Sequence, residues 1–429
     1  MRTITYGRIF LPKVAGFKRF STSLPFGGML SILKIMTVDG LLDSGRLEAA
    51  RALFPHTKEG MVYLNHAATG PLSTRVISAI NQHLQARSLG PIDTYARDIE
   101  EVAGCRANIR KLINAESPER VSLVASTSDS LNIVASGFPW KSGDRVLLNE
   151  LEFPANVYPY LALKRHGVEL DILSSKDGRI TPDMVERGIT PRTRLVAISA
   201  VQFLSGFRAD LASIGDLCRR RGIMFIVDGI QAVGGVRIDV QRMKIDALGA
   251  GAQKWQLGPH GIGFLYLTEQ LQSMVQQQFV GWLSVDNPWD FHNYRQPLAA
   301  AARRYEGGSL NFPGIWGLNA AMSVLLEFGV DAIEHHVLGL TKFLIERSRA
   351  LEGFTLYSPD GDSERAGIVT LQPRRAMDLT GVVKALLEQR VTISLREGKF
   401  RFSPHFYNTP EEIDLAVSAL ADCLASVPG

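Results

Sequence analysis

The sequence predicts an α/β protein in which a large domain with a mainly parallel sheet precedes a smaller α+β domain. Short, unbroken apolar runs such as GIMFIV (222–227) are typical of strands buried on both faces of a parallel sheet. Segments with helical periodicity separate most of these runs, and this alternation favours parallel pairing through helical crossovers. With 429 residues, the chain is long enough for a large domain and a smaller one.

The first 36 residues differ in composition from the rest of the chain. They contain six basic residues, no acid, and four phenylalanines among serines. This composition fits a mitochondrial transit peptide, a disordered tail or a start codon assigned too early, and we favour the last two interpretations. We therefore exclude 1–36 from the fold, and we predict a large domain over 37–314 and a small one over 315–429. We expect a cytoplasmic protein, with a mitochondrial location as the alternative.

Charge, hydropathy and cysteine spacing argue against several classes of partner. The formal net charge is +4, and subtracting the six basic residues of the 1–36 segment leaves −2, which does not favour nucleic-acid binding. No apolar run reaches the roughly 18 residues of a membrane-spanning helix. Cys105, Cys218 and Cys423 lie in helical-looking segments without metal-ligand spacing. We therefore expect no membrane segment, no metal site, and buried thiols in a reducing compartment.

The N-terminal half predicts helices over 40–60, 74–88 and 96–115. Between the first two lies VYLNHAATGPLS (62–73), a strand followed by a loop. VSLVAS (121–126) predicts the first strand of the large sheet, and it runs into a loop of hydroxyl residues that opens a helix. The amides and dipole of a helix N-terminus attract anions, so Thr127 and Ser128 there could bind one. A simple N-cap at Thr127 or Ser128 is the alternative.

Further apolar runs predict the remaining strands of the large sheet. They are DRVLLNEL (144–151), ELDILS (169–174), RLVAISAV (194–201), GIMFIV and FLYL (264–267). Before GIMFIV, DLASIGDLCRRRG (210–222) predicts a helix that places Leu211, Ile214 and Cys218 on one face. These helices and strands together give the alternation that a mainly parallel sheet requires.

The pattern changes from about residue 315 onward. A long helix is predicted to about 351, followed by short strands in AGIVTLQ (366–372) and VTISLRE (391–397). A final helix begins at Thr409, with Glu412 in the spacing of a capping box. This change of pattern predicts a separate small domain.

Two residues able to do chemistry follow the central strands of the large sheet. Asp228 ends the GIMFIV strand, and Lys254 follows the small-residue run ALGAGAQ (247–253). Parallel sheets bind ligands at the carboxyl ends of their strands, and a desolvated lysine can act as a nucleophilic amine. Either residue alone could be a capping acid or a solvated lysine. Together they meet the needs of a pyridoxal phosphate enzyme, in which lysine forms a Schiff base and an acid keeps the pyridine nitrogen protonated.

The segments VDGIQAV (227–233) and IDALGAGAQKWQLGPHGIGFLYL (245–267) resemble the class V aminotransferase family. Its members include cysteine desulfurases, selenocysteine lyases, kynureninases and isopenicillin N epimerase-like proteins, and the resemblance covers about residues 60–425. It implies a large domain of the pyridoxal-phosphate-dependent transferase type (fold type I). It also implies pyridoxal 5′-phosphate (PLP) as cofactor, with Lys254 and Asp228 as the catalytic residues.

The resemblance also implies roles for other residues. Thr127 and Ser128 match the loop that holds the cofactor phosphate, Phe153 matches the residue that stacks on the ring, and Gln202 matches a position near the ring hydroxyl. Gln253 replaces the histidine of many desulfurases and can still donate to the phosphate, and Gln231 could bond the ring hydroxyl. Ser309 lies in a segment that reaches the phosphate of the opposite subunit in relatives, which implies a homodimer. Asn65 and His66 would border the substrate, and Arg401 would grip its carboxylate. From the residues alone, Phe153 could equally be a core residue, His66 structural and Arg401 a surface residue.

One segment departs from the desulfurase pattern. In desulfurases an arginine near the C-terminus precedes a loop that carries the persulfide-forming cysteine, whereas here Arg396 is followed by Glu397 and Gly398 with no cysteine. The nearest resemblance is thus to the isopenicillin N epimerase-like and kynureninase-like branch. We expect an epimerase, aminotransferase or lyase acting at the α-carbon region of an amino acid or peptide-like acid. Cleavage of C–S or C–Se bonds without a protein persulfide is the alternative, and a non-catalytic binding protein is less favoured.

Overall fold

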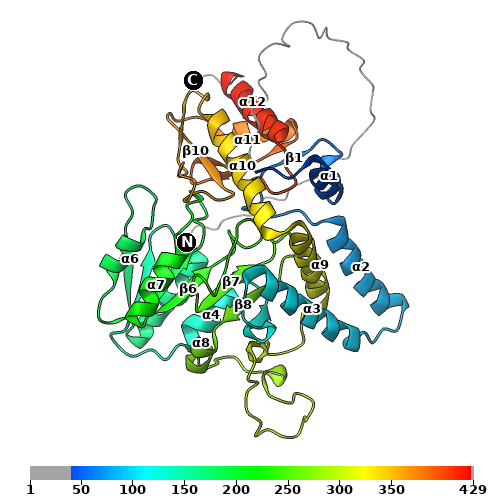
Figure 1. The fold of residues 1–429 in the computed structure, drawn as a ribbon, viewed down its shortest axis with the longest axis vertical. Coiled ribbons are helices and arrows are strands. Elements are labelled where there is room, and N and C mark those ends of the chain that lie inside the picture. The colour runs from blue at the N-terminus through cyan, green and yellow to red at the C-terminus, as the bar shows by residue number, and fades with distance from the viewer. Residues whose placement is uncertain (1–39, 427–429) are drawn as a thin grey trace, which may run out of the picture. The chain divides into compact units, whose positions relative to one another are not determined.

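The computed structural model describes residues 40–426, and Figure 1 shows the arrangement of their elements. All of these elements belong to one unit, Val38–Gly429. The predicted tail, 1–36, lies outside the described residues. None of the described helices is long and apolar enough to cross a membrane.

The large sheet has seven strands in the order β2-β8-β7-β6-β5-β3-β4. Their bounds are β2 Val121–Val124, β3 Arg145–Asn149, β4 Glu169–Leu173, β5 Thr193–Ser199, β6 Met224–Asp228, β7 Ala247–Gly251 and β8 Gly263–Leu267. All neighbours are parallel except β8, which is antiparallel to both β2 and β7. The predicted α/β fold with a mainly parallel sheet is confirmed, and the antiparallel β8 is an addition to it.

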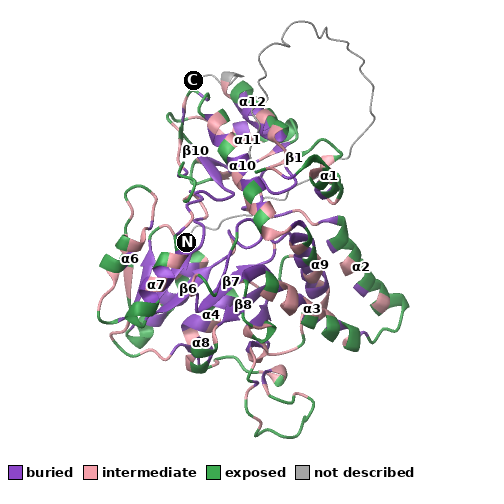
Figure 2. Ribbon diagram, in the orientation of Figure 1, coloured by how far each residue is buried: buried purple, intermediate pink, exposed green. Residues whose placement is uncertain are grey.

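The central strands are buried on both faces, which explains their unbroken apolar runs (Figure 2). Within β6, Phe225 and Val227 pack in one core, while Met224 and Ile226 pack in the other. Successive side chains of a strand point to opposite faces, so each strand supplies both cores. The helices that accompany the sheet are α4 Thr127–Gly137, α5 Tyr158–Leu161, α6 Pro182–Gly188, α7 Leu211–Arg221 and α8 Glu269–Met274. The predicted apolar face of α7 is buried.

A group of helices flanks the sheet on its β2 side. They are α2 Thr74–Leu89, α3 Tyr95–Ile113 and α9 Phe312–Phe328, and α9 packs against α2 and α3. Helix α1 (Ser44–Ala52) lies instead by the C-terminal part, where Arg51 Nη1 donates to the Tyr407 carbonyl at 3.0 Å (Figure 1). The predicted helix over 40–60 is shorter, since it ends at Ala52 and only a 3₁₀ turn at Pro55–Thr57 follows. The single long helix predicted from about 315 to 351 is wrong. The chain forms α9 and then α10 Val330–Ser348, separated by Gly329 at φ +79°, where a left-handed backbone favours glycine.

The C-terminal part contains a four-stranded antiparallel sheet in the order β12-β13-β10-β9. The strands and helices of this C-terminal part are β9 Phe354–Leu356, β10 Val369–Pro373, α11 Leu379–Glu388, β12 Ser394–Arg396, β13 Lys399–Phe402 and α12 Pro410–Ser426. The predicted capping box opens α12, because Thr409 Oγ1 accepts from the Glu412 N–H and Glu412 Oε2 accepts from the Thr409 N–H, each at 3.2 Å. The small antiparallel part of the fold class is therefore confirmed.

The N-terminal segment packs with this C-terminal part through β1. Strand β1 (Val62–Tyr63) pairs in parallel with β11 (Val391–Thr392), and Val62 and Leu64 share a core with Phe400. Helix α9 instead adds Ile315 to the core that includes the large sheet. The domain boundary after 314 remains our proposal.

We predict that Gly249→Ala destabilises the protein, because a Cβ at Gly249 in β7 would lie 2.6 Å from Ser130 Cβ in α4. Overpacking of this kind costs about 1 to 3 kcal/mol. Urea unfolding would measure the change, and Ser130→Gly in the same chain should recover part of it by removing the clashing atom. A Gly249→Ala variant as stable as the native chain would disprove this close approach of α4 to the sheet.

Candidate functional site

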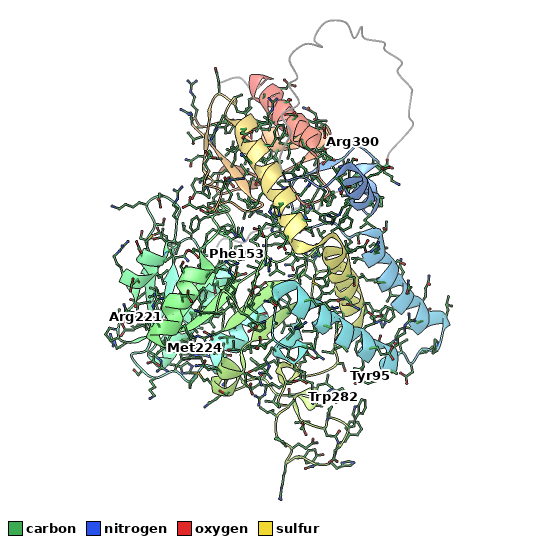
Figure 3. All side chains as sticks on the ribbon, viewed as in Figure 1. Tyr95, Phe153, Arg221, Met224, Trp282 and Arg390 are labelled. Carbon is green, nitrogen blue, oxygen red and sulfur yellow. The ribbon has the colours of Figure 1, made fainter. Side chains whose placement is uncertain are left out.

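A cavity of about 660 Å³ lies where β3, β5, β6 and β7 end. Phe153 follows β3, Gln202 follows β5, Gln231 follows β6 and Lys254 follows β7, and all four line the cavity. Arg396, Arg401 and Tyr357 line it from the C-terminal part. Figure 3 labels Phe153 at the edge of the large sheet. The site therefore forms at the carboxyl ends of parallel strands, where ligands of such sheets bind.

Asp228 is the last residue of β6, in register with Ser199 of β5 and Gly249 of β7. Its side chain is only 2% exposed, and its Oδ1 accepts from the Ile230 N–H at 3.0 Å. Burial is the main effect on the pKa of Asp228 and raises it. The hydrogen bond from the Ile230 N–H lowers this pKa, the negative charge of Glu152 raises it, and the positive charge of Lys254 lowers it. A buried acid in this position gains most from a cationic partner, because the cation restores its charged form.

Lys254 lies beyond β7, and its Nζ is 5.7 Å from the centre of the Phe153 ring. Burial lowers the pKa of the lysine; Asp228 opposes this, and the positive charges of Arg401 and Arg396 add to it. The backbone here is held closely, since the Gly70 N–H donates to the Gln253 carbonyl at 2.8 Å. A Cβ at position 70 would lie 2.2 Å from the Lys254 carbonyl oxygen. The chain thus holds an amine that loses its proton more readily than a solvated lysine.

The N-terminus of α4 lies beside the Gln253 side chain. Thr127 Oγ1 accepts from the Gly251 N–H at 2.8 Å. A Cβ at Gly251 would lie 2.6 Å from Gln253 Oε1 and 3.4 Å from Thr127 Oγ1, so the two side chains converge over that glycine. The N-cap is Ser126, which accepts from the Asp129 N–H at 3.1 Å. The alternative that Thr127 or Ser128 merely caps the helix is therefore wrong, and the pair sits in the first turn.

Gln202 and Gln231, the two residues predicted to lie near the ring hydroxyl, differ in how many hydrogen bonds their side-chain amides already make. Gln231 donates to the Ala67 carbonyl at 3.0 Å and accepts from Trp255 Nε1 at 2.8 Å. Gln202 donates to Glu152 at 3.0 Å, but its buried Oε1 has no hydrogen-bond partner among the described residues. Gln202 therefore keeps one acceptor unsatisfied among the described residues, and that oxygen has less than 1 Å² of accessible surface, so it does not open into the cavity.

Arg401 is a buried arginine, 2% exposed, on strand β13. It donates to the Phe203 carbonyl at 2.6 Å and to Ser394 Oγ at 3.2 Å. Burial and the charge of Arg396 lower its pKa to about 10. No carboxylate forms an ion pair with it among the residues that the structure describes. The alternative of a surface arginine is wrong, and the unpaired guanidinium suits a carboxylate ligand.

The segment that follows Arg396 has no room for a loop. Arg396 pairs with Lys399, so only Glu397 and Gly398 connect β12 to β13, both at positive φ. This is the two-residue hairpin turn that matches the twist of paired strands. Cys105, Cys218 and Cys423 are all buried, and none of them lines the cavity.

Several predicted site residues do not line this cavity, namely Thr127, Ser128, Asp228, Gln253, Asn65, His66 and Ser309. His66 is fully buried, with Nδ1 2.8 Å from the Ser403 carbonyl and Nε2 2.7 Å from the Tyr407 hydroxyl, and its place beside the substrate stays a prediction. Asn65 forms a bridge with Ser403 and does not line the cavity either. Ser309 is exposed beside other cavities, and its contact with a second subunit remains a prediction. From the same loop, Ala67 and Ala68 line the site instead.

Sequence reasoning missed Glu152, a buried acid that lines the cavity. The only sequence signal was an acid between a strand and Phe153. No group of His, Cys, Asp and Glu residues suited to a metal ion occurs in the described part of the chain.

The residues present fit PLP. A buried acid lies close enough to a lysine to influence its lowered pKa, and an aromatic ring lies beside that lysine. The Thr127 and Gln253 side chains at a helix N-terminus suit an anionic group such as a phosphate.

Comparison with known proteins agrees with this fit. The model of the family described as "Aminotransferase class-V" matches residues 62–415. The uncharacterized aminotransferase YcbU of Bacillus subtilis is 29% identical over 374 residues, covering 87% of this chain and 97% of YcbU. A probable cysteine desulfurase of Halalkalibacterium halodurans is 30% identical over 390 residues, covering 84% and 92%.

Two solved structures share the fold. The cysteine desulfurase CsdA of Escherichia coli has a TM-score of 0.80 at 22% identity, covering 89% of this chain and 99% of CsdA. The apo cysteine desulfurase of Thermococcus onnurineus NA1 has a TM-score of 0.81 at 23% identity, covering 89% and 98%. With the family match spanning most of the chain, this protein belongs to the class V aminotransferase family of PLP-dependent enzymes.

Proposed function

We propose that the protein acts at the α-carbon of an amino acid or peptide-like acid, as an epimerase, an aminotransferase or a lyase. One observation carries this proposal: Lys254 and Arg401, both largely buried, line one cavity, and Asp228 lies close enough to shift the pKa of Lys254. Chemistry at the α-carbon of a carboxylate substrate needs three groups: a lysine that can lose its proton, a nearby acid and an unpaired guanidinium.

The residues divide into those that bind the cofactor and those that act on the substrate. Thr127, Ser128 and Gln253 would bind the phosphate at the α4 N-terminus, and Phe153 would cover the ring and exclude water. Bound PLP supplies an electron sink for the substrate α-carbon. Lys254 would hold the cofactor covalently and, once released by the substrate, would move the α-proton through its Nζ.

Asp228 would control the electron sink. Burial raises its pKa in the isolated chain, and a protonated ring nitrogen beside it would bring the pKa down again by favouring the carboxylate. The acid and the ring nitrogen would thus stabilise each other's charge. This mutual effect explains why an acid is buried at the end of β6.

Arg401 would select the substrate. Its guanidinium is buried without a carboxylate partner, and such an uncompensated charge is costly. A substrate carboxylate would relieve this cost and would accept two parallel hydrogen bonds. The substrate would therefore be an acid rather than a simple amine.

Cleavage of a C–S or C–Se bond is the second candidate, and the relatives named as cysteine desulfurases favour it. The two-residue turn after Arg396 and the burial of all three cysteines argue against a persulfide on the chain. Burial raises the pKa of Cys218 to about 12 and also raises that of Cys105, so neither is a ready nucleophile. In this candidate, sulfur or selenium would leave without passing through a protein thiol.

We expect Asp228→Asn to keep bound PLP but to slow exchange of the substrate α-hydrogen, because the neutral amide does not hold the charged ring nitrogen. Loss of a charged hydrogen bond predicts a decrease of about 10- to 150-fold. NMR of α-deuterium exchange over a panel of amino acids would measure it. Asp246→Asn, which changes a buried acid bonded to the Phe225 N–H, is the matched control. Near-native exchange in Asp228→Asn would remove Asp228 from the mechanism.

We expect Arg401→Lys to weaken carboxylate substrates while leaving the cofactor absorbance intact, because lysine presents a single point charge. Losing one charge-assisted contact costs about 2 to 3 kcal/mol, or roughly 30- to 150-fold in kcat/KM. Steady-state kinetics with an amino acid and its decarboxylated amine would measure this selectivity. If the native enzyme used the amine equally well, the carboxylate role of Arg401 would be refuted.

We expect simultaneous replacement of Cys105, Cys218 and Cys423 by alanine to leave the activity per folded molecule nearly unchanged, because none lines the cavity. Intact-mass spectrometry of the native enzyme during turnover with cysteine should find no added sulfur on the chain. A cysteine-dependent persulfide would contradict the expectation, as would loss of activity in a variant whose circular dichroism is native.

A further inference from the structure

The small antiparallel sheet has one face toward the core and the other toward the cavity. In strand β13, Phe400 and Phe402 belong to the core of the C-terminal part, whereas Arg401 between them lines the cavity. Arg401 is paired with Thr370 of β10 on one side and with Ser394 of β12 on the other. Because successive side chains of a strand alternate between the two faces, this row of residues marks the face that is open to a ligand.

Arg396 belongs to the same face of the sheet. It is two residues beyond Ser394 on β12, so it lies diagonally across from Arg401. The Cα atoms of such diagonal neighbours are about 7 to 8 Å apart, a separation that long side chains can bridge. Both arginines line the cavity. Burial lowers the pKa of Arg401 and the positive charge of Arg396 lowers it further, which agrees with two cations at this separation.

The four strands of this sheet carry three basic residues, Arg396, Lys399 and Arg401, and no acid. All three lie on the cavity face, since Lys399 is paired directly with Arg396. Lys399 is already engaged, because its Nζ lies 4.7 Å from the centre of the Tyr357 ring and donates to the Glu397 carbonyl at 3.2 Å. Arg396 has neither an ion pair nor a side-chain hydrogen bond among the described residues. It therefore keeps all of its donors for a ligand.

The three acids that line the cavity leave Arg396 without a partner. Glu150 accepts from two donors in the segment after β4, and buried Glu152 accepts from neutral donors at the end of β5. Glu397 follows Arg396 in the hairpin turn and forms no ion pair with it. Arg396 is itself exposed, so it stands where an incoming ligand first meets the cavity.

We propose that Arg396 binds a second anionic group of the substrate, so that the preferred substrate is an amino acid whose side chain ends in a carboxylate. Arg401 would hold the α-carboxylate deep in the cavity, and Arg396 would hold the side-chain carboxylate nearer the opening. The inference rests on the proposed function, because it names the substrate class of the same site. A carboxylate accepts two parallel hydrogen bonds from a guanidinium, whereas the corresponding amide has only one oxygen to offer.

The test compares each acidic amino acid with its own amide, which has nearly the same size and lacks the charge. Aspartate with asparagine, glutamate with glutamine, and 2-aminoadipate with its side-chain amide cover three side-chain lengths. NMR of α-deuterium exchange by the PLP-loaded enzyme gives kcat/KM for each compound. For the best pair, the native enzyme should prefer the acid by about 5- to 30-fold. Arg396→Gln should bring this ratio near unity, and Arg396→Lys should keep part of it.

Inhibitor binding gives a second readout, which does not depend on turnover. Glutarate and its monoamide both carry a carboxylate for Arg401 and differ in the second charge. Their dissociation constants with the PLP-loaded enzyme should show the same preference for the acid, and Arg396→Gln should remove it.

Lys399→Gln is the matched control, since it removes one positive charge from the same hairpin at a residue that does not line the cavity. It should keep most of the preference for the acids. A loss in Lys399→Gln as large as that in Arg396→Gln would overturn the inference, because the general field of the hairpin, and not a contact with Arg396, would then select the substrate.

Two failures are distinguishable. If the PLP-loaded native enzyme exchanges the α-hydrogen of no compound in the panel, the proposed function fails and the inference fails with it. If it exchanges them but treats acids and amides alike, or if Arg396→Gln keeps the preference, Arg396 does not select the substrate, while the proposed function stands. A change that slows acids and amides by the same factor would place Arg396 at the α-carboxylate and would also overturn the inference.

Discussion

The site depends on the parallel pairing of β6 with its neighbours, which forces an acid and an amine into one buried region. Register places Asp228 between Ser199 and Gly249, and three residues beyond β7 the chain reaches Lys254. Burial raises the pKa of the acid and lowers that of the amine, so both are held near the point where a proton is easily moved. The rest of the fold buries Asp228 and leaves Lys254 at the wall of the cavity.

The hydrogen bonds of the charged groups around the cavity indicate which ligands it takes. Three basic residues, Lys254, Arg396 and Arg401, and three acids, Glu150, Glu152 and Glu397, line it. Neutral donors already bind Glu150 and Glu152. Arg401 is the extreme case, because it is buried and its bonds go to a carbonyl and a hydroxyl only. An anionic substrate group would complete this arrangement. The burial of the Arg401 charge therefore has two effects: it is unfavourable in the unliganded cavity, and it favours ligands that carry a carboxylate.

Sequence reasoning reached the residues whose role follows from their own segment. Asp228 and Lys254 could be predicted because a buried strand delivers its last residue to a known edge of the sheet. The fold class followed from the same apolar runs. Gly329 was misjudged because a helical pattern continues on both sides of it, and only its positive φ reveals the break. The reversed direction of β8 leaves no trace in a short apolar run.

Other residues were missed because their roles depend on distant partners. His66 follows a strand, but bonds to Ser403 and Tyr407, more than 300 residues away, turn it into the core. Glu152 was missed for the same reason, because its role comes from Ser199 and Gln202, about 50 residues away, whose donors join it to the end of β5 at the cavity. No local pattern encodes such contacts.

The central claim is that Lys254 carries PLP in this chain, and borohydride reduction of the PLP-loaded protein followed by peptide mapping tests it most directly. Reduction fixes the cofactor to the amine that holds it, so the account predicts a pyridoxyl group on the peptide containing Lys254 and on no other. A label on a different lysine, or no label after saturation with PLP, would contradict the account.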